Sequence, residues 1–546
     1  MNFLVKHHFK ILLIFLSLFP ILALLPSGFP ITHDGQDHVA RIANFYLNLE
    51  QGSLIPRWAS NLNWGYGHPI LMFLYPLPSY IASLFHFLGF SFVNSTKIVM
   101  GLGMFLSLPF MYLWLREFTS KYAALFGAVL FTYAPYRFVD LYVRGDVGEN
   151  LAFPFIPLTL FFIYRLYKNQ DLKYFILGSF SLSFLILSHN AISLILMPFI
   201  LLYSLLLIYL SKYKKTLIIN LVFLIILGLA LSAFFWIPAL LEGKYTLRDI
   251  VTAGTYINRF VNFEQLIYGP WSYGITGQFT LQFGPLSWIS LLLSPLVLIF
   301  GKKDKYKFYL ALILIAFSIF SIFIMLPVSN FIWSKIIILQ NFQFPWRFLA
   351  MVLFTTSVLG ALLLDSLNKK INVKLVSISA IIIILLISIN YAKPKAYQEK
   401  SESFYTGIYE STTDTGESAP IWSVRFMEHR PSAHLEIIDG YAEIEEIERS
   451  STYHKYQIKV DAKTLFRENT LYFPGWKITA NNLPVEVYFQ NKDYQGIMTF
   501  FLNKGSYETV ARFEETKLRM ISNIISLLSL ISIFSLFIYS KVRKIK

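Results

Sequence analysis

The chain has 546 residues, of which 55% are hydrophobic and only 14% are charged, and it carries a net charge of +15. This composition excludes an ordinary soluble protein. The lysines and arginines gather in short loops between apolar runs, which also argues against nucleic-acid binding. The absence of cysteine excludes disulfide bonds. The sequence therefore predicts an α-helical polytopic membrane protein.

The first apolar run follows a basic N-terminus. Residues 1–10 are basic and residues 11–25 are apolar, as in a signal peptide, but no small-x-small cleavage site precedes Pro26. We therefore predict a retained first membrane helix.

Eleven further apolar runs have about the length that a helix needs to cross a hydrocarbon core roughly 30 Å thick. They lie near residues 97–115, 122–139, 150–165, 174–188, 191–211, 216–239, 284–301, 308–326, 346–365, 375–391 and 519–540. Together with the first helix, these runs predict about twelve spans.

The run 70–90 is apolar but is interrupted by Pro76 and Pro78. If it does not span, every later basic cluster falls on the side of the N-terminus, as the positive-inside rule requires; if it spans, every later cluster falls outside. We therefore predict an interfacial or re-entrant helical hairpin on the exterior. The protein would then be a multi-pass protein of the plasma (inner) membrane with both termini in the cytoplasm.

This topology places residues 27–96, 140–149, 240–283, 327–345 and 392–518 on the extracytoplasmic side. Within the last segment, apolar and polar residues alternate at 434–438, 456–460 and 485–489, as in half-buried strands, and Asn481-Asn482 suits a tight hairpin. We predict three parts: a transmembrane domain over 1–391, with juxtamembrane helices in its first loop 27–96; a small extracytoplasmic β-sandwich over 392–518; and a last membrane helix with a basic cytoplasmic tail over 519–546.

The first exterior loop begins with a dense group of ionisable residues. Asp34 follows the first helix, and Asp37, His38 and Arg41 follow at helical spacing, so these side chains could share one face of a surface helix. The alternative is a solvated amphipathic helix on which Asp34 is a cap.

Several strings carry a resemblance to known proteins. They are DGQDHVAR, GxLxPRW, GYGHP, YPLPSY, LSHN, FQFPWRF and YFPGW. These strings resemble a bacterial group related to the YfhO-type membrane proteins, some of which are described as 6-pyruvoyl-tetrahydropterin-synthase-related. More broadly, the Asp just after the first membrane helix, the juxtamembrane helix, the Pro-rich interfacial hairpin and the acidic second exterior loop resemble the GT-C superfamily of polyprenyl-phosphate-dependent glycosyltransferases. These residues do not indicate pterin chemistry.

The resemblance implies a GT-C-like fold and an inverting transfer of a sugar from a polyprenyl-phosphate carrier to a glycan, lipid or protein of the cell envelope. Asp34 would be the base that accepts the proton of the acceptor hydroxyl. Arg347, with Arg41 and Arg57, would bind the donor phosphate. The alternative for Arg347 is an interfacial anchor beside Trp346.

The second exterior loop supplies Asp146 and Glu149, which with Asp37 and His38 would orient the acceptor or a metal. No cofactor is certain, but Asp34, Asp37 and Asp146 offer oxygen ligands suited to Mg²⁺ or Mn²⁺. Further side chains are expected to line the cavity: His68, Tyr75, His189 and Asn190. For His189 and Asn190, a capping or loop role is the alternative.

Two other functions compete with the transferase. A transporter or flippase of lipid-linked glycans predicts ionisable residues deep inside spans or broken helices in matching halves, and the sequence indicates neither. A non-catalytic envelope assembly protein would leave the acids of two exterior loops without a shared role.

Overall fold

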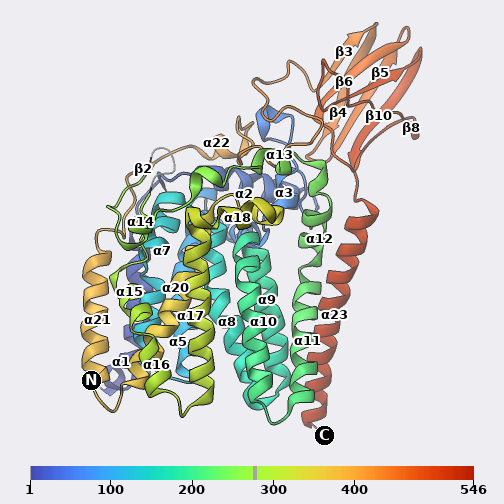
Figure 1. Cartoon of the computed structure of the whole chain (residues 1–546). Helices are drawn as coiled ribbons and strands as arrows, with labels where there is room; N and C mark the ends of the chain where they lie inside the picture. The colour runs from blue at the N-terminus through green and yellow to red at the C-terminus, as the bar shows by residue number, and fades with distance from the viewer. Residues whose placement is uncertain (1, 275–278, 546) are drawn as a thin grey trace.

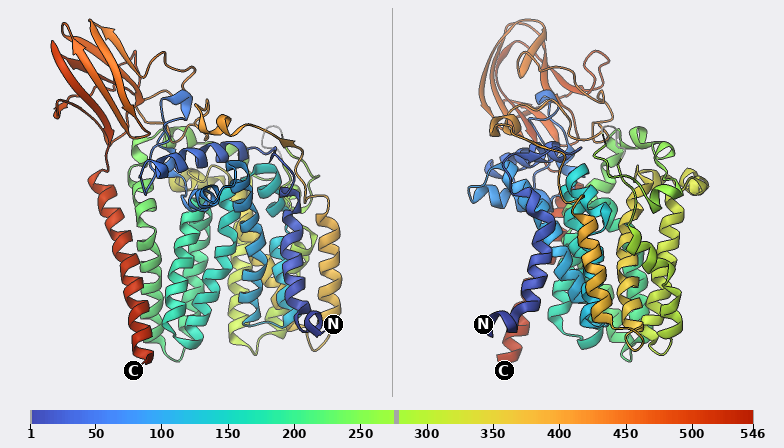
Figure 2. Two further views of the ribbon diagram at one scale, coloured as in Figure 1. Left: turned by 180° about the vertical axis from the view of Figure 1, so that it is seen from behind. Right: turned by 90° about the vertical axis from the view of Figure 1, so that its left-hand side faces the viewer.

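The computed structural model describes residues 2–274 and 279–545. Long helices run side by side in one bundle, and the strands project from one end of it (Figure 1). The start of α1 (Asn2–Leu18) and the end of α23 (Lys517–Ile545) lie at the opposite end (Figure 2). The bundle therefore separates the β-rich region from both ends of the chain.

Within the described residues, seven helices are long and apolar enough to cross a membrane. They are α5 (Phe92–Arg116), α8 (Val147–Asn169), α10 (Asn190–Leu210), α11 (Lys214–Leu231), α17 (Lys305–Met325), the continuous stretch Pro345–Ser366, which includes α20 (Leu349–Ser366), and Lys517–Ile538 of α23. Four shorter apolar helices accompany them: Phe9–Leu24, Lys121–Thr132, Leu172–Ser188 and Val373–Ser388. The chain is thus a membrane protein with several apolar helices, and the number of about twelve spans stays a prediction.

Three of the predicted spans are interrupted. The breaks divide α6 (Lys121–Thr132) from α7 (Pro135–Val139), α11 from α12 (Ala233–Leu241), and α15 (Pro285–Leu292) from α16 (Pro295–Phe300). Pro135 and Pro295 each open the second helix of a pair, because proline fits the first turn of a helix but not its interior. The transporter hypothesis predicts broken helices in matching halves of the chain, and the breaks show that broken helices are present without placing them in matching halves.

The run 70–90 does not form a single helix. It folds into α3 (Ile70–Phe73) and α4 (Leu77–Phe87), neither of which is long enough to span. The α4 helix packs against α2 (Gly35–Glu50), where the rings of Phe45 and Tyr80 meet edge to face at 4.8 Å. The α2 helix lies across the end of the bundle nearest the strands (Figure 2). This arrangement agrees with the predicted hairpin.

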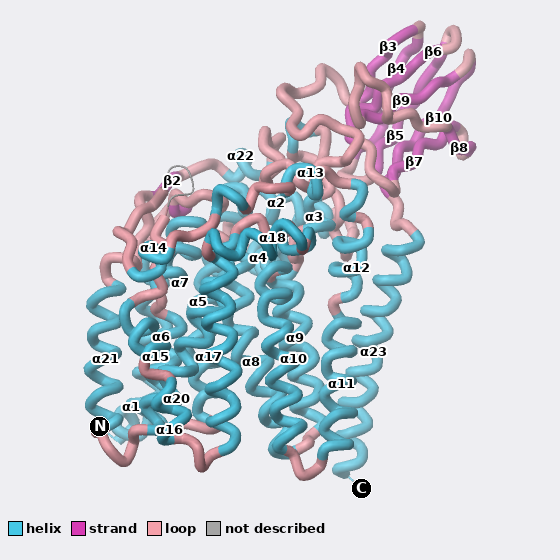
Figure 3. Tube along the Cα trace, in the orientation of Figure 1, coloured by secondary structure: helices cyan, strands magenta, loops and turns pink. Residues whose placement is uncertain are grey.

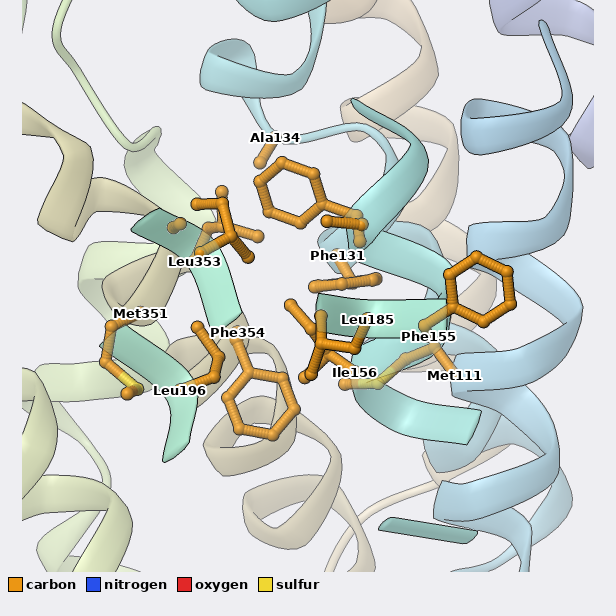
Figure 4. Packing of buried hydrophobic residues seen from close by; sticks show 14 of the residues in the cluster. Met111, Phe131, Ala134, Phe155, Ile156, Leu185, Leu196, Met351, Leu353 and Phe354 are labelled. Atoms are coloured by element: carbon orange, nitrogen blue, oxygen red, sulfur yellow. The ribbon is translucent and has the colours of Figure 1, made fainter. Parts of the chain in front are cut away.

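The α20 helix is the centre of the bundle, with 94% of its apolar stretch buried. Its Phe354 ring stacks on Trp114 at 5.7 Å and meets Phe199 edge to face at 5.1 Å (Figure 4 shows Phe354 among its neighbours). A helix that is apolar on all sides is stable only when it is surrounded. This packed core holds the helix ends from which the loops of the strand-bearing end project.

Short helices lie at the strand-bearing end of the bundle. They are α13 (Arg248–Thr252), α14 (Phe263–Ile267), α18 (Asn330–Lys335), α19 (Ile337–Gln340) and α22 (Glu402–Thr406). The apolar helices α9 (Leu172–Ser188) and α21 (Val373–Ser388) complete the bundle.

The C-terminal region forms two antiparallel sheets, drawn as magenta strands in Figure 3. The strands are β3 (Leu435–Asp439), β4 (Ala442–Arg449), β5 (Tyr453–Val460), β6 (Thr464–Leu471), β7 (Trp476–Ala480), β8 (Leu483–Val485), β9 (Ile497–Leu502) and β10 (Gly505–Phe513). Their orders are β4-β5-β10-β7-β8 and β3-β6-β9, and buried side chains of both sheets form one core. The predicted hairpin joins β7 to β8, with Asn481 and Asn482 at φ values of 50° and 65°.

Residues 397–420, which we call the strap, belong to neither sheet. β2 (Tyr397–Gln398) of the strap pairs with β1 (Phe29–Pro30), and the strap then crosses α2. The N–H of Trp64 donates to the carbonyl of Tyr409 at 3.0 Å. The strap therefore packs on the first exterior loop, although the sequence prediction placed these residues in the β-sandwich.

Candidate functional site

Four segments of the chain meet at the strand-bearing end of the bundle: the start of α2, the loop before α8, the junction of α9 and α10, and the turn before α20. The backbone joins the first two, because the N–H of Asp34 donates to the carbonyl of Arg144 at 2.8 Å and the N–H of His33 donates to that of Val143 at 2.9 Å. Asp34 directly precedes α2, but its side chain makes no capping hydrogen bond. The carboxyl group of Asp34 is therefore available for another role beside the loop before α8.

Arg144 is the centre of the buried part of the site. Its guanidinium donates to Glu149 Oε2 at 2.7 Å, to Asp146 Oδ2 at 2.8 Å and to Asp140. It also lies over the ring of Trp346, 4.7 Å from the ring centroid. Because Arg144 and the three acids are all buried, the attraction between them must offset the loss of hydration of four charged groups.

Two glycines allow the second loop to approach the first. Gly145 adopts φ = +71°, and a Cβ atom there would lie 2.3 Å from Thr32 Oγ1. A Cβ atom on Gly148 would lie 1.9 Å from the ring of Tyr75, whose hydroxyl donates to Asp146 Oδ1 at 3.2 Å. The spacing of glycines around Asp146 is therefore what brings Tyr75 into the site.

His189 enters from the junction of α9 and α10. Its Nδ1 accepts the N–H of Ile192 at 3.2 Å, which caps α10 and leaves Nε2 facing Asp146 Oδ2 at 3.7 Å. Its ring also packs on Tyr75, with the ring centroids 4.8 Å apart. The capping role predicted as an alternative for His189 is therefore present. The same side chain also faces Asp146, so the two roles do not exclude each other.

The described residues contain one group suited to a metal ion, and it differs from the predicted one. Donor atoms of Asp146, Glu149 and His189 all lie within 4.8 Å of one another. Asp34 and Asp37, predicted to join Asp146, are not members of that group. The oxygen and nitrogen donors suit a divalent ion such as Mn²⁺. An ion would compete with Arg144, whose guanidinium already bonds both carboxylates.

The environments of two carboxyl groups move their pKa values in opposite directions. Asp34 remains partly accessible to solvent, but the protein around its carboxyl group makes ionisation less favourable and raises its pKa. The nearby charge of Arg144 opposes this effect without cancelling it. Burial also opposes ionisation of Asp146, but the charge of Arg144 and the neighbouring His189 hold the pKa of Asp146 well below its usual range. Asp146 is thus a fixed anion, whereas Asp34 is suited to exchange a proton.

Other predicted residues of α2 face the strap. Tyr409 donates to Asp37 Oδ1 at 2.8 Å. The Nε of Arg41 donates to Thr413 Oγ1 at 2.8 Å, and its Nη1 lies 3.2 Å from His38 Nδ1. Burial first, and then the charge of Arg41, lower the pKa of His38 to about 3, so the ring is neutral at physiological pH.

The structure does not bring three other predicted residues to the acids. Arg57 donates to Glu515, to Asn523 and to the carbonyl of Phe234, and so joins the first loop to α12 and α23. His68 faces Asp414 of the strap at 3.6 Å. Asn190 donates to the carbonyl of Phe73 at 3.0 Å.

Arg347 lies at the edge of the site. It follows Trp346, the residue that packs on Arg144, and its guanidinium donates to the carbonyl of Phe342 at 2.8 Å. It also lies over the Phe344 ring, 4.9 Å from the centroid. The turn before α20 thus presents one aromatic residue to the buried acids and one cation outside them.

A small pocket opens between α2 and the 70–90 hairpin. It is lined by His38, Arg41, Ile42, Phe45, Leu71, Leu74, Tyr75, Pro76, Pro78 and Ser79. Its volume of about 20 Å³ admits little more than one water molecule. Tyr75 connects this pocket with Asp146, so a larger ligand that entered here would move the hairpin or the strap.

Sequence reasoning missed Arg144 and the strap. A signal for Arg144 was present, because a short membrane-proximal loop with three acids that become buried needs a cation among them. Nothing comparable marked Tyr409, Thr413 or Asp414, whose partners lie more than 300 residues earlier in the chain.

The chain is similar in sequence to a bacterial protein. An uncharacterized protein of Lactococcus lactis subsp. cremoris (strain MG1363) is 27% identical over 362 residues, which cover 63% of this chain and 55% of that protein. The chain thus spans about half the length of this relative.

Several solved structures align with the chain at low identity. AftD, an arabinofuranosyltransferase from Mycobacteria, is 14% identical over 71% of this chain and 26% of its own, with a TM-score of 0.43. The apo oligosaccharyltransferase of Archaeoglobus fulgidus is 13% identical over 77% and 62%, with a TM-score of 0.45. ArnT from Cupriavidus metallidurans, bound to undecaprenyl phosphate, is 9% identical over 71% and 90%, with a TM-score of 0.32.

One family covers most of the bundle. The 6-pyruvoyl-tetrahydropterin synthase related domain, described as a membrane protein, matches residues 71–394, which is more than half of the chain. The match includes Tyr75, the Arg144 cluster, His189 and Arg347. The chain belongs to this family of 6-pyruvoyl-tetrahydropterin synthase related membrane proteins.

Proposed function

We propose that this protein is a membrane glycosyltransferase that moves a sugar from a polyprenyl-phosphate carrier to an acceptor of the cell envelope. The observation that carries the proposal is the convergence of Asp34, the Arg144 cluster and the turn bearing Arg347 at one end of the bundle. This convergence would supply a proton acceptor, a fixed anion and, in Arg347, a cation that has no carboxylate partner among the described residues.

The proposed reaction is an inverting displacement at the anomeric carbon. The acceptor oxygen forms a bond to that carbon, the bond from the carbon to the phosphate oxygen breaks, and the acceptor proton passes to the carboxylate of Asp34. The electron pair of the broken bond leaves with the lipid phosphate. A raised pKa suits Asp34 to this role, because a stronger base accepts the proton more readily.

The Arg144 cluster would position the reacting groups. Asp146 is held ionised and also bonds Tyr75, so it can orient Tyr75 and an acceptor hydroxyl from one side. If a divalent cation binds, Asp146, Glu149 and His189 would hold it after Arg144 moves aside, and it would offset the charge on the leaving phosphate.

The site would face the extracytoplasmic side. The basic loops Lys302–Lys307 and Lys369–Lys374 lie at the end of the bundle opposite the site, on the side of the α1 start (Figure 1). The positive-inside rule places such loops in the cytoplasm. The donor would therefore be a lipid-linked sugar of the outer leaflet.

A donor panel tests this function. The full chain is reconstituted in liposomes and offered radiolabelled sugars on polyprenyl phosphate or on nucleoside diphosphates, with envelope glycan and lipid acceptors. We expect transfer from lipid-linked donors only. Movement of the lipid-linked glycan across the bilayer without transfer would favour the transporter hypothesis, and transfer from nucleotide sugars alone would overturn the proposed donor class.

A further inference from the structure

Two arginines share one aromatic ring at the edge of the site. Arg259 lies over Phe344 with its guanidinium carbon 4.2 Å from the ring centroid, and Arg347 lies over the same ring at 4.9 Å. Arg259 ends the short helix Ile257–Arg259, whereas Phe344 and Arg347 belong to the turn before α20. The ring therefore holds together two like charges that would otherwise repel each other.

These two cations lack the carboxylate partners that Arg144 and Arg519 have. Within the described residues, no carboxylate lies within 4.0 Å of either guanidinium, and the buried Nε of Arg347 has no hydrogen-bond partner. By contrast, Arg144 is paired with three acids, and Arg519 with Glu242. Two adjacent unpaired guanidiniums provide forked donors suited to a phosphate group.

Four exposed isoleucines lie on the short helices that flank this pair in the chain, and we call them the isoleucine rim. Ile250, Ile257, Ile337 and Ile338 are 66%, 53%, 74% and 64% exposed, and all four lie on the short helices of the exterior end. A hydrogen bond joins the segment after α13 to the end of α19, because the N–H of Gly254 donates to Gln340 Oε1 at 3.3 Å. Exposed isoleucines of this kind beside a membrane bundle favour contact with lipid chains.

We propose that Arg259, Phe344 and Arg347 form a clamp for the phosphate of the lipid-linked sugar donor, whose hydrocarbon chain lies along the isoleucine rim. This inference rests on the proposed function and adds Arg259 as a donor-binding residue. Trp346 links the clamp to the reacting groups, because it follows Phe344 by two residues and packs on Arg144. A phosphate held by the clamp would place its sugar toward Asp34 and Asp146.

The clamp is tested by binding and by transfer with the full chain in nanodiscs. The variants are Arg259→Gln, Arg347→Gln and Phe344→Leu. The matched control is Arg248→Gln, which removes a nearby arginine that pairs with the exposed Asp249. The binding probe is radiolabelled polyprenyl phosphate without a sugar. Thermal unfolding of each variant checks that it is folded.

We expect the loss of either clamp arginine to raise the Kd for polyprenyl phosphate, and the donor KM, about tenfold with little change in kcat. The control should leave both unchanged. Inorganic phosphate and phosphatidylglycerol should compete weakly. Equal competition by phosphatidylglycerol would overturn the donor assignment, and unchanged Kd values in both arginine variants would overturn the clamp. Binding that depends on the clamp in a chain that transfers no sugar would instead support the clamp and overturn the transferase.

Discussion

At the scale of single residues, Arg144 determines whether the loop before α8 can be buried. Its guanidinium bonds Asp140, Asp146 and Glu149, and each of these acids is at most 5% exposed. Removing one partner of a buried ion pair is costly, because the remaining charges stay buried without compensation.

We therefore expect Arg144→Gln to lower the free energy of unfolding by about 3–5 kcal/mol. Arg248→Gln should change it by less than about 0.5 kcal/mol, because Arg248 pairs only with the exposed Asp249. Thermal and denaturant unfolding of the detergent-solubilised protein measures both. Equal stability of the two variants would show that the acids do not depend on Arg144.

His38 makes stability depend on pH. Burial lowers its pKa to about 3 in the folded protein, whereas an unfolded histidine titrates near 6.5. The unfolded chain thus binds the proton first, and the stabilising effect of a neutral His38 is complete above about pH 6.5 and is lost as the pH falls toward 3.

Between pH 7.5 and pH 5, His38 should account for a loss of about 2 kcal/mol of stability. His38→Asn should remove that part of the pH dependence, while His434→Asn, at an exposed position of the β-rich region, should retain it. Unfolding curves at the two pH values compare the slopes. A wild-type slope that matches His38→Asn would contradict a buried neutral ring.

At the scale of elements, the first turn of α8 packs against Tyr75 because Gly148 lacks a side chain. A methyl group there would displace Tyr75 and break its hydrogen bond to Asp146. We expect Gly148→Ala to lower the transfer rate about tenfold or more, since small misplacements of positioning groups have large kinetic costs.

Gly269→Ala is the matched control. Its added Cβ atom would meet its nearest neighbour at 3.6 Å, an ordinary contact, so the rate should not change. Transfer rates at saturating donor compare the two variants. Full activity of Gly148→Ala would show that Tyr75 is not needed where the structure places it.

The strap could not be predicted from the sequence. Its residues show neither helical nor alternating periodicity, and its bonds to α2 join positions such as Arg41 and Thr413 that are 372 residues apart. The apolar runs predicted the helices well because length and hydropathy decide insertion locally. They did not reveal the breaks after α6 and α15, because proline starts a new helix there without changing the hydropathy of the run.

At the scale of the whole molecule, the charges of the loops predicted that acidic and basic loops lie on opposite sides, and the fold separates them at opposite ends of the bundle. The acids of the first and second loops lie at the strand-bearing end, and the lysine-rich loops at the other. The sequence could indicate that Asp34, Asp146 and Arg347 share one side, but it could not show that Arg57 and His68 face away from the acids. Those orientations depend on long-range contacts with α23 and the strap.

The orientation in the membrane has a direct test because the chain contains no cysteine. We expect Asp249→Cys to react with a membrane-impermeant maleimide on intact cells. Lys303→Cys should react only after permeabilisation, since the lysine loops are predicted to be cytoplasmic. The reverse pattern would place the site in the cytoplasm and contradict a donor in the outer leaflet.

Asp34 is the proposed base of the sugar transfer. Its role is tested by the transfer rate of Asp34→Asn beside Asp249→Asn, an equal change at an exposed aspartate, with both variants folded to the same level. We expect Asp34→Asn to lower kcat by about 10²-fold or more with donor binding unchanged, while the control keeps full activity. Equal rates in wild type and Asp34→Asn would rule out Asp34 as the base.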